Sequence, residues 1–142
     1  INMGLDNDNV FRIGGWSDGL NTYRMTLDAS GNAVFKNNVT AYSDRRLKTN
    51  INTIENALEK VLKMRGVTYE RFDSDGNVKG VGVIAQEIKE ILPEVVVESA
   101  PIDGQDEGEG YLSVSYGNIV GVLIEAIKEL KEEIEVLKGQ IK

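Results

Sequence analysis

The C-terminal stretch GNIVGVLIEAIKELKEEIEVLKGQIK, residues 117–142, decides how the rest of the chain is organised. Its apolar residues recur in alternating steps of four and three, which is the heptad spacing of a coiled coil. We therefore expect one long helix that packs against copies of itself, with Glu133 and Lys138 beside the seam and able to pair between helices. Isoleucine at one seam position and leucine at the other would by itself favour two strands. The predicted seam residues are Leu123, Ile127, Leu130, Ile134, Leu137 and Ile141.

A small globular part, residues 43–116, is expected in front of this helix. Its first element is predicted from apolar residues at helical spacing between Ile51 and Leu62. The spacing predicts a helix over about residues 52–65, with Gly66 just past its end, where helices commonly stop.

A β-hairpin is expected next. The segments VTYERF (67–72) and VKGVGVI (78–84) have strand-like composition and flank the turn sequence DSDGN (73–77). Gly80 and Gly82 lie in the second arm, where glycines mark either a weak strand or a close approach by another group.

Shorter elements complete the globular part. AQEIKEIL (85–92) predicts a short helix that Pro93 stops, because proline cannot continue a helix. EVVVE (94–98) and YLSVSY (111–116) predict strands on either side of the acidic loop PIDGQDEGEG (101–110).

Residues 1–42 differ from the rest in being rich in Gly, Asn and Asp. YRMTL (23–27) and AVF (33–35) predict two strands around the turn DASGN (28–32), with Tyr23, Met25 and Leu27 alternating with polar residues. Strands this few and short do not make an independent sheet, so they need more chain or more copies of the chain. The predicted fold class is therefore α+β, with short strands, a helix and hairpin domain, and a long C-terminal coiled-coil helix.

Composition excludes several functions. The net charge of -7 argues against a nucleic-acid partner and against an anionic membrane. The chain has no Cys and no His, which removes thiol nucleophiles, the commonest general base and the commonest zinc ligand. No apolar run approaches the roughly 20 residues of a membrane span, and the start lacks a signal-peptide pattern. Since it also lacks an initiator Met, we expect a piece of a longer chain that is made in the cytoplasm.

Other candidate binding sites have simpler explanations. GVGVIA (80–85) lacks the third glycine of a dinucleotide loop, and the acidic loop does not have the ligand spacing of a calcium site. We expect no cofactor, no metal and no small-molecule substrate. Trp16, Tyr23 and Phe35 are candidate contacts for a receptor-binding tip, although core positions are the commoner place for aromatic residues.

One pair of residues has chemical potential at the junction of the two parts, in TAYSDRRLK (40–48). Ser43 needs a base to become a nucleophile, and Lys48 is the substitute for an absent histidine. A lysine with a pKa of about 10.4 must be buried or placed near positive charge, such as Arg45 and Arg46, to act in this way. Five residues do not place two side chains on one face of a helix or strand, so the pair must meet across a turn or between chains. Spacing alone favours an ordinary linker.

Three ordered blocks change this assessment: SDRRLKTNI (43–51), GVGVIAQEIKEILPEVV (80–96) and YLSVSYGNIVGVLIEAIKEL (111–130). Together they resemble the C-terminal intramolecular chaperone domain of bacteriophage tailspikes and tail fibres. The preceding LDASGNAVFKNNVTAY (27–42) is similar to the end of such a fibre.

The resemblance implies three parts: a trimeric β-rich fibre end (1–42), a chaperone and auto-peptidase part (43–116) and a trimeric coiled-coil helix (117–142). It implies an intertwined homotrimer, in place of the two strands favoured by the seam alone. The domain is expected to align the upstream fibre of the same chain and then cut itself off. The mature fibre would lie in the virion tail, and the chaperone part would be released.

The resemblance also assigns roles to residues. Ser43 would be the nucleophile, Lys48 its base and Asp44 an orienting acid. The bond between Tyr42 and Ser43 would be cut, with the bond between Ser43 and Asp44 as the lesser alternative. The competing interpretations are a trimerisation module that is never cut, in which Ser43 is a linker residue, and a receptor-binding tip. Whether Lys48 serves Ser43 of its own chain or of a neighbour stays open.

Overall fold

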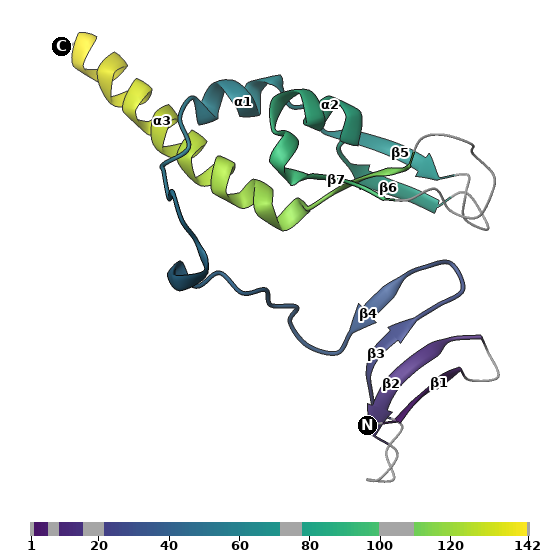
Figure 1. Ribbon diagram of the computed structural model, residues 1–142. Coiled ribbons are helices and arrows are strands. Elements are labelled where there is room, and N and C mark those ends of the chain that lie inside the picture. The colour runs from purple at the N-terminus through teal and green to yellow at the C-terminus, as the bar shows by residue number, and fades with distance from the viewer. Residues whose placement is uncertain (1, 6–8, 16–21, 72–77, 100–109, 142) are drawn as a thin grey trace. The chain divides into compact units, whose positions relative to one another are not determined.

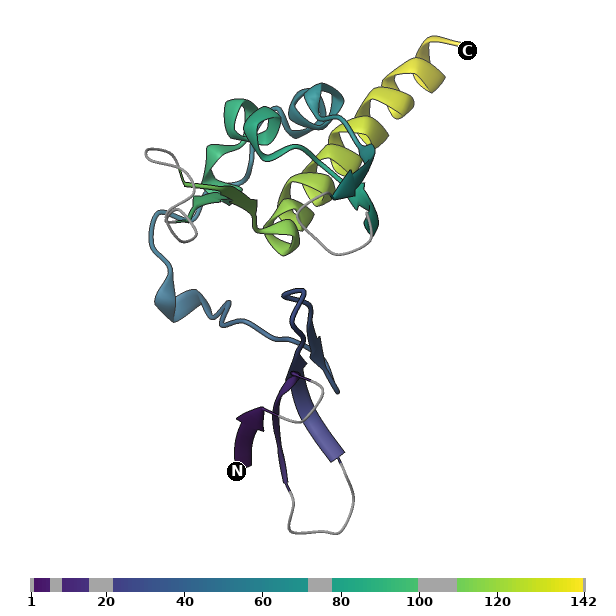
Figure 2. The same ribbon diagram turned by 90° about the vertical axis from the view of Figure 1, so that its right-hand side faces the viewer.

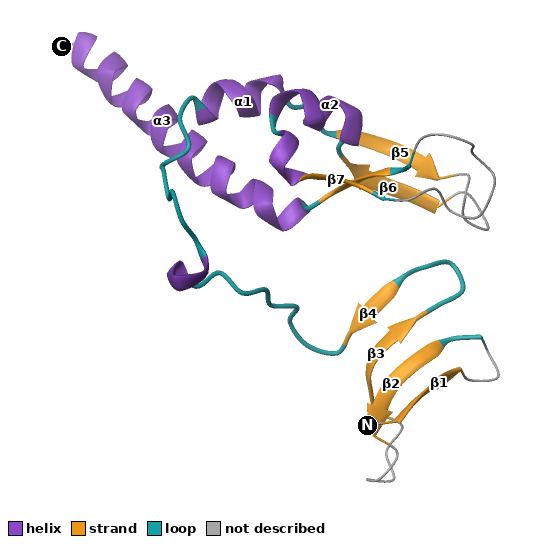
Figure 3. Ribbon diagram, viewed as in Figure 1, coloured by secondary structure: helices purple, strands orange, loops and turns teal. Residues whose placement is uncertain are grey.

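The computed structural model describes residues 2–5, 9–15, 22–71, 78–99 and 110–141 of the 142. It has mixed α and β structure in two compact units, which meet in sequence between Thr49 and Asn50 (Figure 1). The N-terminal unit contains strands and one short turn of helix. The C-terminal unit contains the α-helices and two pairs of strands (Figure 3).

The N-terminal unit contains a four-stranded antiparallel sheet in the order β1-β2-β3-β4. The predicted hairpin of β3 and β4 is confirmed, and its turn is held by Asp28, whose carboxylate accepts hydrogen bonds from the backbone N–H groups of Ser30 and Asn32. Gly31 has a φ of 81°, a conformation that glycine adopts without steric cost. The strands are β1 (Asn2–Leu5), β2 (Phe11–Gly15), β3 (Thr22–Leu27) and β4 (Ala33–Phe35).

The predicted alternation along β3 is correct for Met25 and Leu27 and wrong for Tyr23. The register passes from Ile13 opposite Met25 to Gly14 opposite Tyr23, so Arg24 is the extra residue of a β-bulge. A bulge moves the following side chain to the other face of the sheet. There the guanidinium of Arg12 lies 4.7 Å from the centre of the Tyr23 ring.

One face of this sheet is apolar across all four strands. Residues that are directly opposite each other in neighbouring strands point to the same face, and the register aligns two apolar rows. The side chains of Met3, Leu5 and Phe35 are 67%, 72% and 46% exposed. The sheet therefore does not bury its apolar face within the described residues. The rows are Met3, Ile13, Met25, Phe35 and Leu5, Phe11, Leu27, Ala33.

The C-terminal unit has the predicted order of elements. The predicted hairpin of β5 and β6 and the short helix that ends before Pro93 are confirmed. The two strands predicted on either side of the acidic loop are present, and they pair antiparallel with each other. The predicted turn at 73–77 and most of the acidic loop lie outside the described residues. The elements are α1 (Ala57–Lys63), β5 (Val67–Arg71), β6 (Val78–Gly82), α2 (Ala85–Ile91), the 3-10 turn η2 (Pro93–Val95), β7 (Val96–Glu98), β8 (Leu112–Val114), the 3-10 turn η3 (Tyr116–Asn118) and α3 (Ile119–Gln140).

The two glycines of β6 lie where aromatic rings approach the backbone. Gly80 is directly opposite Tyr69, and a Cβ atom at Gly80 would come within 2.5 Å of that ring. A Cβ atom at Gly82 would overlap the hydroxyl of Tyr116. The sequence GVG is thus explained by close packing, one of the two roles predicted for it.

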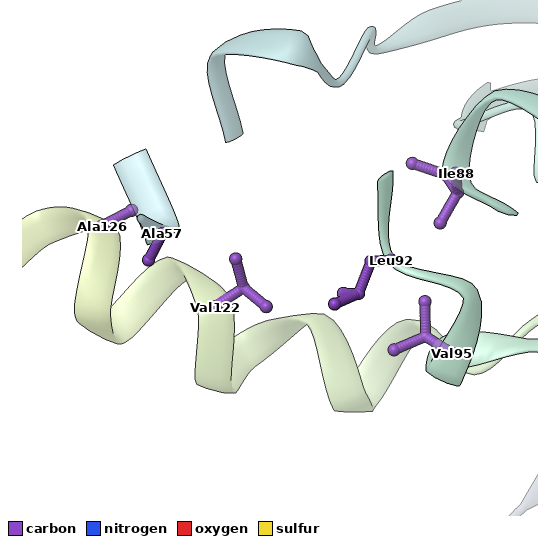
Figure 4. Packing of buried hydrophobic residues seen from close by; sticks show 6 residues of the cluster. All are labelled: Ala57, Ile88, Leu92, Val95, Val122 and Ala126. Atoms are coloured by element: carbon purple, nitrogen blue, oxygen red, sulfur yellow. The ribbon is translucent and has the colours of Figure 1, made fainter. Parts of the chain in front are cut away.

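The core of the unit lies between α1, α2 and the first half of α3. Figure 4 shows Ala57 against Ala126 of α3, and Leu92 between Val122 and Val95. Ile88 and Ala57 are fully buried. The buried apolar residues are Ala57, Ile88, Leu92, Val95, Val122 and Ala126. No helix of the described chain is both long and apolar enough to span a membrane.

Helix α1 is shorter than the predicted helix at 52–65. It ends at Lys63, and the following residue, Met64, is extended, so Gly66 is not its cap. It begins at Ala57, because Asn56 has a left-handed backbone with a φ of 53° that a right-handed helix cannot include.

The start of α1 is held by a residue far away in the sequence. Asn56 makes no capping hydrogen bond through its side chain. Instead, the carboxylate of Glu129 in α3 accepts hydrogen bonds from the backbone N–H groups of Ala57 and Leu58, at 2.9 and 2.8 Å. These two bonds lower the pKa of Glu129 below its ordinary value. They satisfy two of the N–H groups that every helix start leaves without a partner.

We expect Glu129→Ala to lower the melting temperature of the chain by several degrees at neutral pH, measured by circular dichroism at one fixed protein concentration. Because the pKa of Glu129 is depressed in the folded state, its contribution is complete above 4.5 and is lost as the pH falls through the lower, folded value. The difference between wild type and variant should therefore shrink in acid. Glu132→Ala, at an exposed position of α3, is the matched control and should melt like wild type. Equal melting of the two variants would contradict this role of Glu129.

Candidate active site

A short 3-10 turn, η1 (Arg45–Leu47), lies at the junction singled out in the sequence. Asp44 begins the turn, and its carboxylate accepts a hydrogen bond from the backbone N–H of Arg46 at 2.8 Å. Two backbone bonds close the turn, from Leu47 N–H to the Asp44 carbonyl and from Lys48 N–H to the Arg45 carbonyl, both 3.1 Å. Asp44 is thus the N-cap of the turn, a position that aspartate favours.

This turn brings the two predicted catalytic residues together. Lys48 Nζ donates a hydrogen bond to Ser43 Oγ at 2.7 Å, within one chain. The 3-10 geometry therefore provides the turn that a spacing of five residues required. Both side chains are exposed in the single chain. The arrangement places a hydroxyl beside an amine, as a serine–lysine pair requires, and it lacks burial around the amine.

The guanidinium of Arg46 forms hydrogen bonds with the same carboxylate that caps the turn. Its Nη2 lies 2.7 Å from Asp44 Oδ2, and its Nε lies 3.1 and 3.2 Å from the two carboxylate oxygens. These bonds lower the pKa of Asp44 and raise that of Arg46. Asp44 contacts neither Ser43 nor Lys48 through a hydrogen bond that the structure describes, so it can orient them only through the turn.

The predicted cleavage position is accessible. The Tyr42 side chain is 95% exposed, and residues 36–44 belong to no helix or strand. The backbone around this bond therefore has no helix or sheet hydrogen bonds to break before it changes conformation. The structure thus brings Ser43 and Lys48 together beside an accessible bond, whereas Asp44 caps the turn and forms no described hydrogen bond with either residue.

The predicted seam lies on α3 and faces outward. Helix α3 presents a second, buried face to the core through Val122 and Ala126, and Glu129 continues that face toward α1. The C-terminal part of α3 extends beyond the rest of its unit (Figure 2). The seam residues are exposed in the single chain: Leu123 42%, Ile127 67%, Leu130 45%, Ile134 42%, Leu137 57% and Ile141 85%.

Charged residues beside the seam pair within the helix in the single chain. Lys138 Nζ lies 3.2 Å from Glu135 Oε1, one turn earlier. The pairing of Glu133 with Lys138 between helices stays a prediction, since it needs a second chain.

Sequence reasoning missed one residue, Glu129, which links α3 to the start of α1. Nothing near it in the sequence distinguishes it from the other glutamates of α3, because its partners, Ala57 and Leu58, lie 72 and 71 residues away. Of the aromatic candidates for a receptor-binding tip, Trp16 lies outside the described residues, Phe35 is on the apolar face of the sheet and Tyr23 stacks on Arg12. No cluster of metal-ligating side chains occurs among the described residues.

The chain thus has strands before the junction, a turn that joins Ser43 to Lys48 at it, and after it a helical unit that ends in a long helix with an exposed heptad. Residues 43–97 match the family model described as the chaperone of endosialidase, and this part of the chain belongs to that family. The match begins at Ser43, the first residue of the serine–lysine turn.

The similar proteins are tail fibre proteins of phages. The chain is 40% identical over 121 residues to the long tail fiber protein Gp37 of Enterobacteria phage M1, covering 82% of this chain and 46% of that protein. It is 36% identical over 107 residues to Gp37 of Enterobacteria phage K3, covering 73% of this chain and 8% of that protein. For Gp37 of Salmonella phage S16 the identity is 30% over 118 residues, with 79% and 15% covered. The chain thus spans less than half the length of these relatives.

Proposed function

We propose that this chain is the end of a phage tail fibre joined to an intramolecular chaperone that assembles three copies and then releases itself by autoproteolysis. The observation that carries the proposal is the hydrogen bond between Lys48 Nζ and Ser43 Oγ at the first residue of the chaperone family match. The similarity to long tail fibre proteins supports the upstream fibre as the segment that is aligned.

The proposed cut is a single-turnover acyl transfer. Ser43 Oγ attacks the carbonyl carbon of Tyr42 and gives its proton to Lys48 Nζ. The bond between this carbon and the Ser43 nitrogen then breaks, and the nitrogen takes the proton from the lysine. The resulting ester between Tyr42 and the Ser43 oxygen is hydrolysed by water, which leaves a carboxylate on Tyr42 and a free amine on Ser43. No cofactor takes part.

Assembly is proposed to switch this chemistry on. A lysine accepts a proton only in its neutral form, and burial favours that form. Since the Lys48 side chain is exposed in the single chain, association of three chains is the step that we infer buries it. Cleavage would then follow assembly rather than precede it.

The order of events follows from the cost of bringing chains together. The long helix forms from local contacts, so it is able to associate early, whereas pairing of strands between chains is slow. Three chains joined at α3 raise each other's effective concentration. The apolar rows of the β1–β4 sheet are exposed at Met3, Leu5, Leu27 and Phe35 and half-buried at Phe11, Ile13 and Met25. They are the surfaces that we expect the aligned fibre ends to bury. Once the chaperone part has been removed, the lifetime of the fibre is set by its rate of unfolding rather than by an equilibrium with separate chains.

The alternative is a trimerisation module that is never cut, in which Ser43 is a linker residue. The exposure of the Lys48 side chain is the observation that favours it, because a lysine needs burial or nearby positive charge to act as a general base. In either case, synthesis is expected in the cytoplasm of the host bacterium, and the fibre part is expected in the virion tail. Release of the chaperone part belongs to the first proposal alone.

We expect Ser43→Ala and Lys48→Ala each to leave an uncut trimer, whereas the wild type gives two products. Denaturing gels and intact mass measure this, and the larger product should begin at Ser43. A product that begins at Asp44 would instead indicate the lesser alternative bond. Arg45→Ala is the control, because it alters the same turn without touching the dyad. Cutting at the junction in either dyad variant would contradict the assignment.

Replacing Leu130 and Ile134 together by Asp should yield monomers, seen by sedimentation equilibrium. Burying each of these side chains contributes about 1.5–3 kcal/mol, and a carboxylate in the seam is strongly unfavourable. The same variant should fail to cut if assembly activates the dyad. Glu132→Ala, at an exposed non-seam position of α3, should assemble and cut like wild type. A monomeric variant that still cuts would contradict the coupling of cleavage to assembly.

Mixed trimers of Ser43→Ala and Lys48→Ala chains separate a dyad within one chain from a dyad between chains. The hydrogen bond within one chain supports the first arrangement, so we expect no cutting in the mixture. Ser43→Ala trimers mixed with wild type are the control and should cut in proportion to their wild-type content. Recovered cutting in the mixture of single variants would show that the dyad forms between neighbouring chains.

A further inference from the structure

We propose that Arg46 is a positioning residue for self-cleavage, acting through Asp44 to hold the turn that places Lys48 on Ser43. This role rests on the proposed function. The hydrogen bonds between the Arg46 guanidinium and the Asp44 carboxylate would then affect the rate of cleavage, although neither side chain touches the reacting atoms.

The turn has little else to hold it. Residues 45–48 are all exposed, and η1 has no buried residue. Its stability therefore rests on two backbone hydrogen bonds and on the Asp44 carboxylate. This carboxylate accepts hydrogen bonds both from the backbone N–H of Arg46 and from the Arg46 guanidinium. A planar guanidinium that bonds both carboxylate oxygens fixes the orientation of the carboxylate, which a single bond does not.

The position of Lys48 depends on this turn directly. Its backbone N–H donates to the Arg45 carbonyl, so the turn sets where the lysine stem begins, and its amine then reaches Ser43 Oγ at 2.7 Å. Reactions between groups held in place are sensitive to small displacements, and a shift of about 1 Å can cost on the order of 100-fold in rate. Loosening the turn should therefore slow cleavage without altering the chemical groups that perform it.

Arg45 offers a matched control within the same turn. It carries the same charge one residue earlier, and its side chain makes no hydrogen bond or ion pair that the structure describes. If the arginines acted through positive charge near Lys48, both would matter. If Arg46 acts by positioning, only its removal slows cleavage, and the effects of removing Asp44 and Arg46 are not additive.

The experiment follows cleavage of freshly translated full-length chains over time for wild type, Arg45→Ala, Arg46→Ala, Asp44→Ala and the double variant Asp44→Ala/Arg46→Ala. We expect Arg46→Ala to be slowed on the order of 10- to 100-fold, and Arg45→Ala to cut at nearly the wild-type rate. The double variant should be no slower than Asp44→Ala alone, because residues that act as one unit are not additive. The pH at which the rate is half-maximal should be the same in Arg46→Ala and wild type.

Sedimentation of the same samples shows whether assembly is intact, and Asp44→Asn, which retains an oxygen to cap the turn, should fall between wild type and Asp44→Ala. Equal rates for Arg45→Ala and Arg46→Ala, additive effects in the double variant, or a shifted pH dependence in Arg46→Ala would each overturn the positioning role while leaving the dyad in place. A wild-type chain that is never cut would overturn the proposed function, and the role of Arg46 with it.

Discussion

The carboxylate of Glu129 on the first two N–H groups of α1 is the interaction on which the C-terminal unit depends most. Helix α1 is only seven residues long, begins after a left-handed Asn56, and has no local cap. Isolated helices of this length are not stable in water, so α1 exists because α3 supplies both its apolar partners and its cap. Glu129 thereby fixes where the chain that comes from the serine–lysine turn enters the core.

This dependence gives α3 three functions on three parts of its surface. One face completes the core through Val122 and Ala126, Glu129 caps α1, and the heptad face stays exposed. The same helix thus packs into its own unit on one side and leaves apolar side chains exposed on another. Among the described residues, the buried core is small, which leaves apolar surface for the association that we propose.

The N-terminal sheet has the same incompleteness for a different reason. Its register places apolar residues of all four strands on one face, and within the described residues that face has no cover. An exposed apolar face of this kind is what the proposed burial between aligned fibre ends would cover. The turn at residues 45–47 is the opposite kind of structure, because it is small, polar and held by local hydrogen bonds.

The sequence by itself determined the features whose causes are local. The heptad of α3, the hairpin of β3 and β4 with Gly31 in its turn, and the end of α2 before Pro93 follow from residue spacing, from the backbone freedom of glycine and from the closed ring of proline. For Gly80 and Gly82 the sequence left a weak strand and a close approach open, and the rings of Tyr69 and Tyr116 decided for the close approach. The serine–lysine junction was found because of its order among recognisable blocks, since a spacing of five residues alone predicted a linker.

Only the tertiary structure decided the features whose causes are distant. The start of α1 was wrongly predicted because it depends on Asn56 taking a left-handed backbone and on a carboxylate 72 residues away. The face of Tyr23 was wrongly predicted because a bulge at Arg24 is set by pairing with β2. The meeting of Lys48 with Ser43 required a 3-10 turn, which Asp44 and Arg46 stabilise with bonds that no periodicity reveals. Local patterns fix which elements form, and contacts between distant residues fix where they begin and what they bring together.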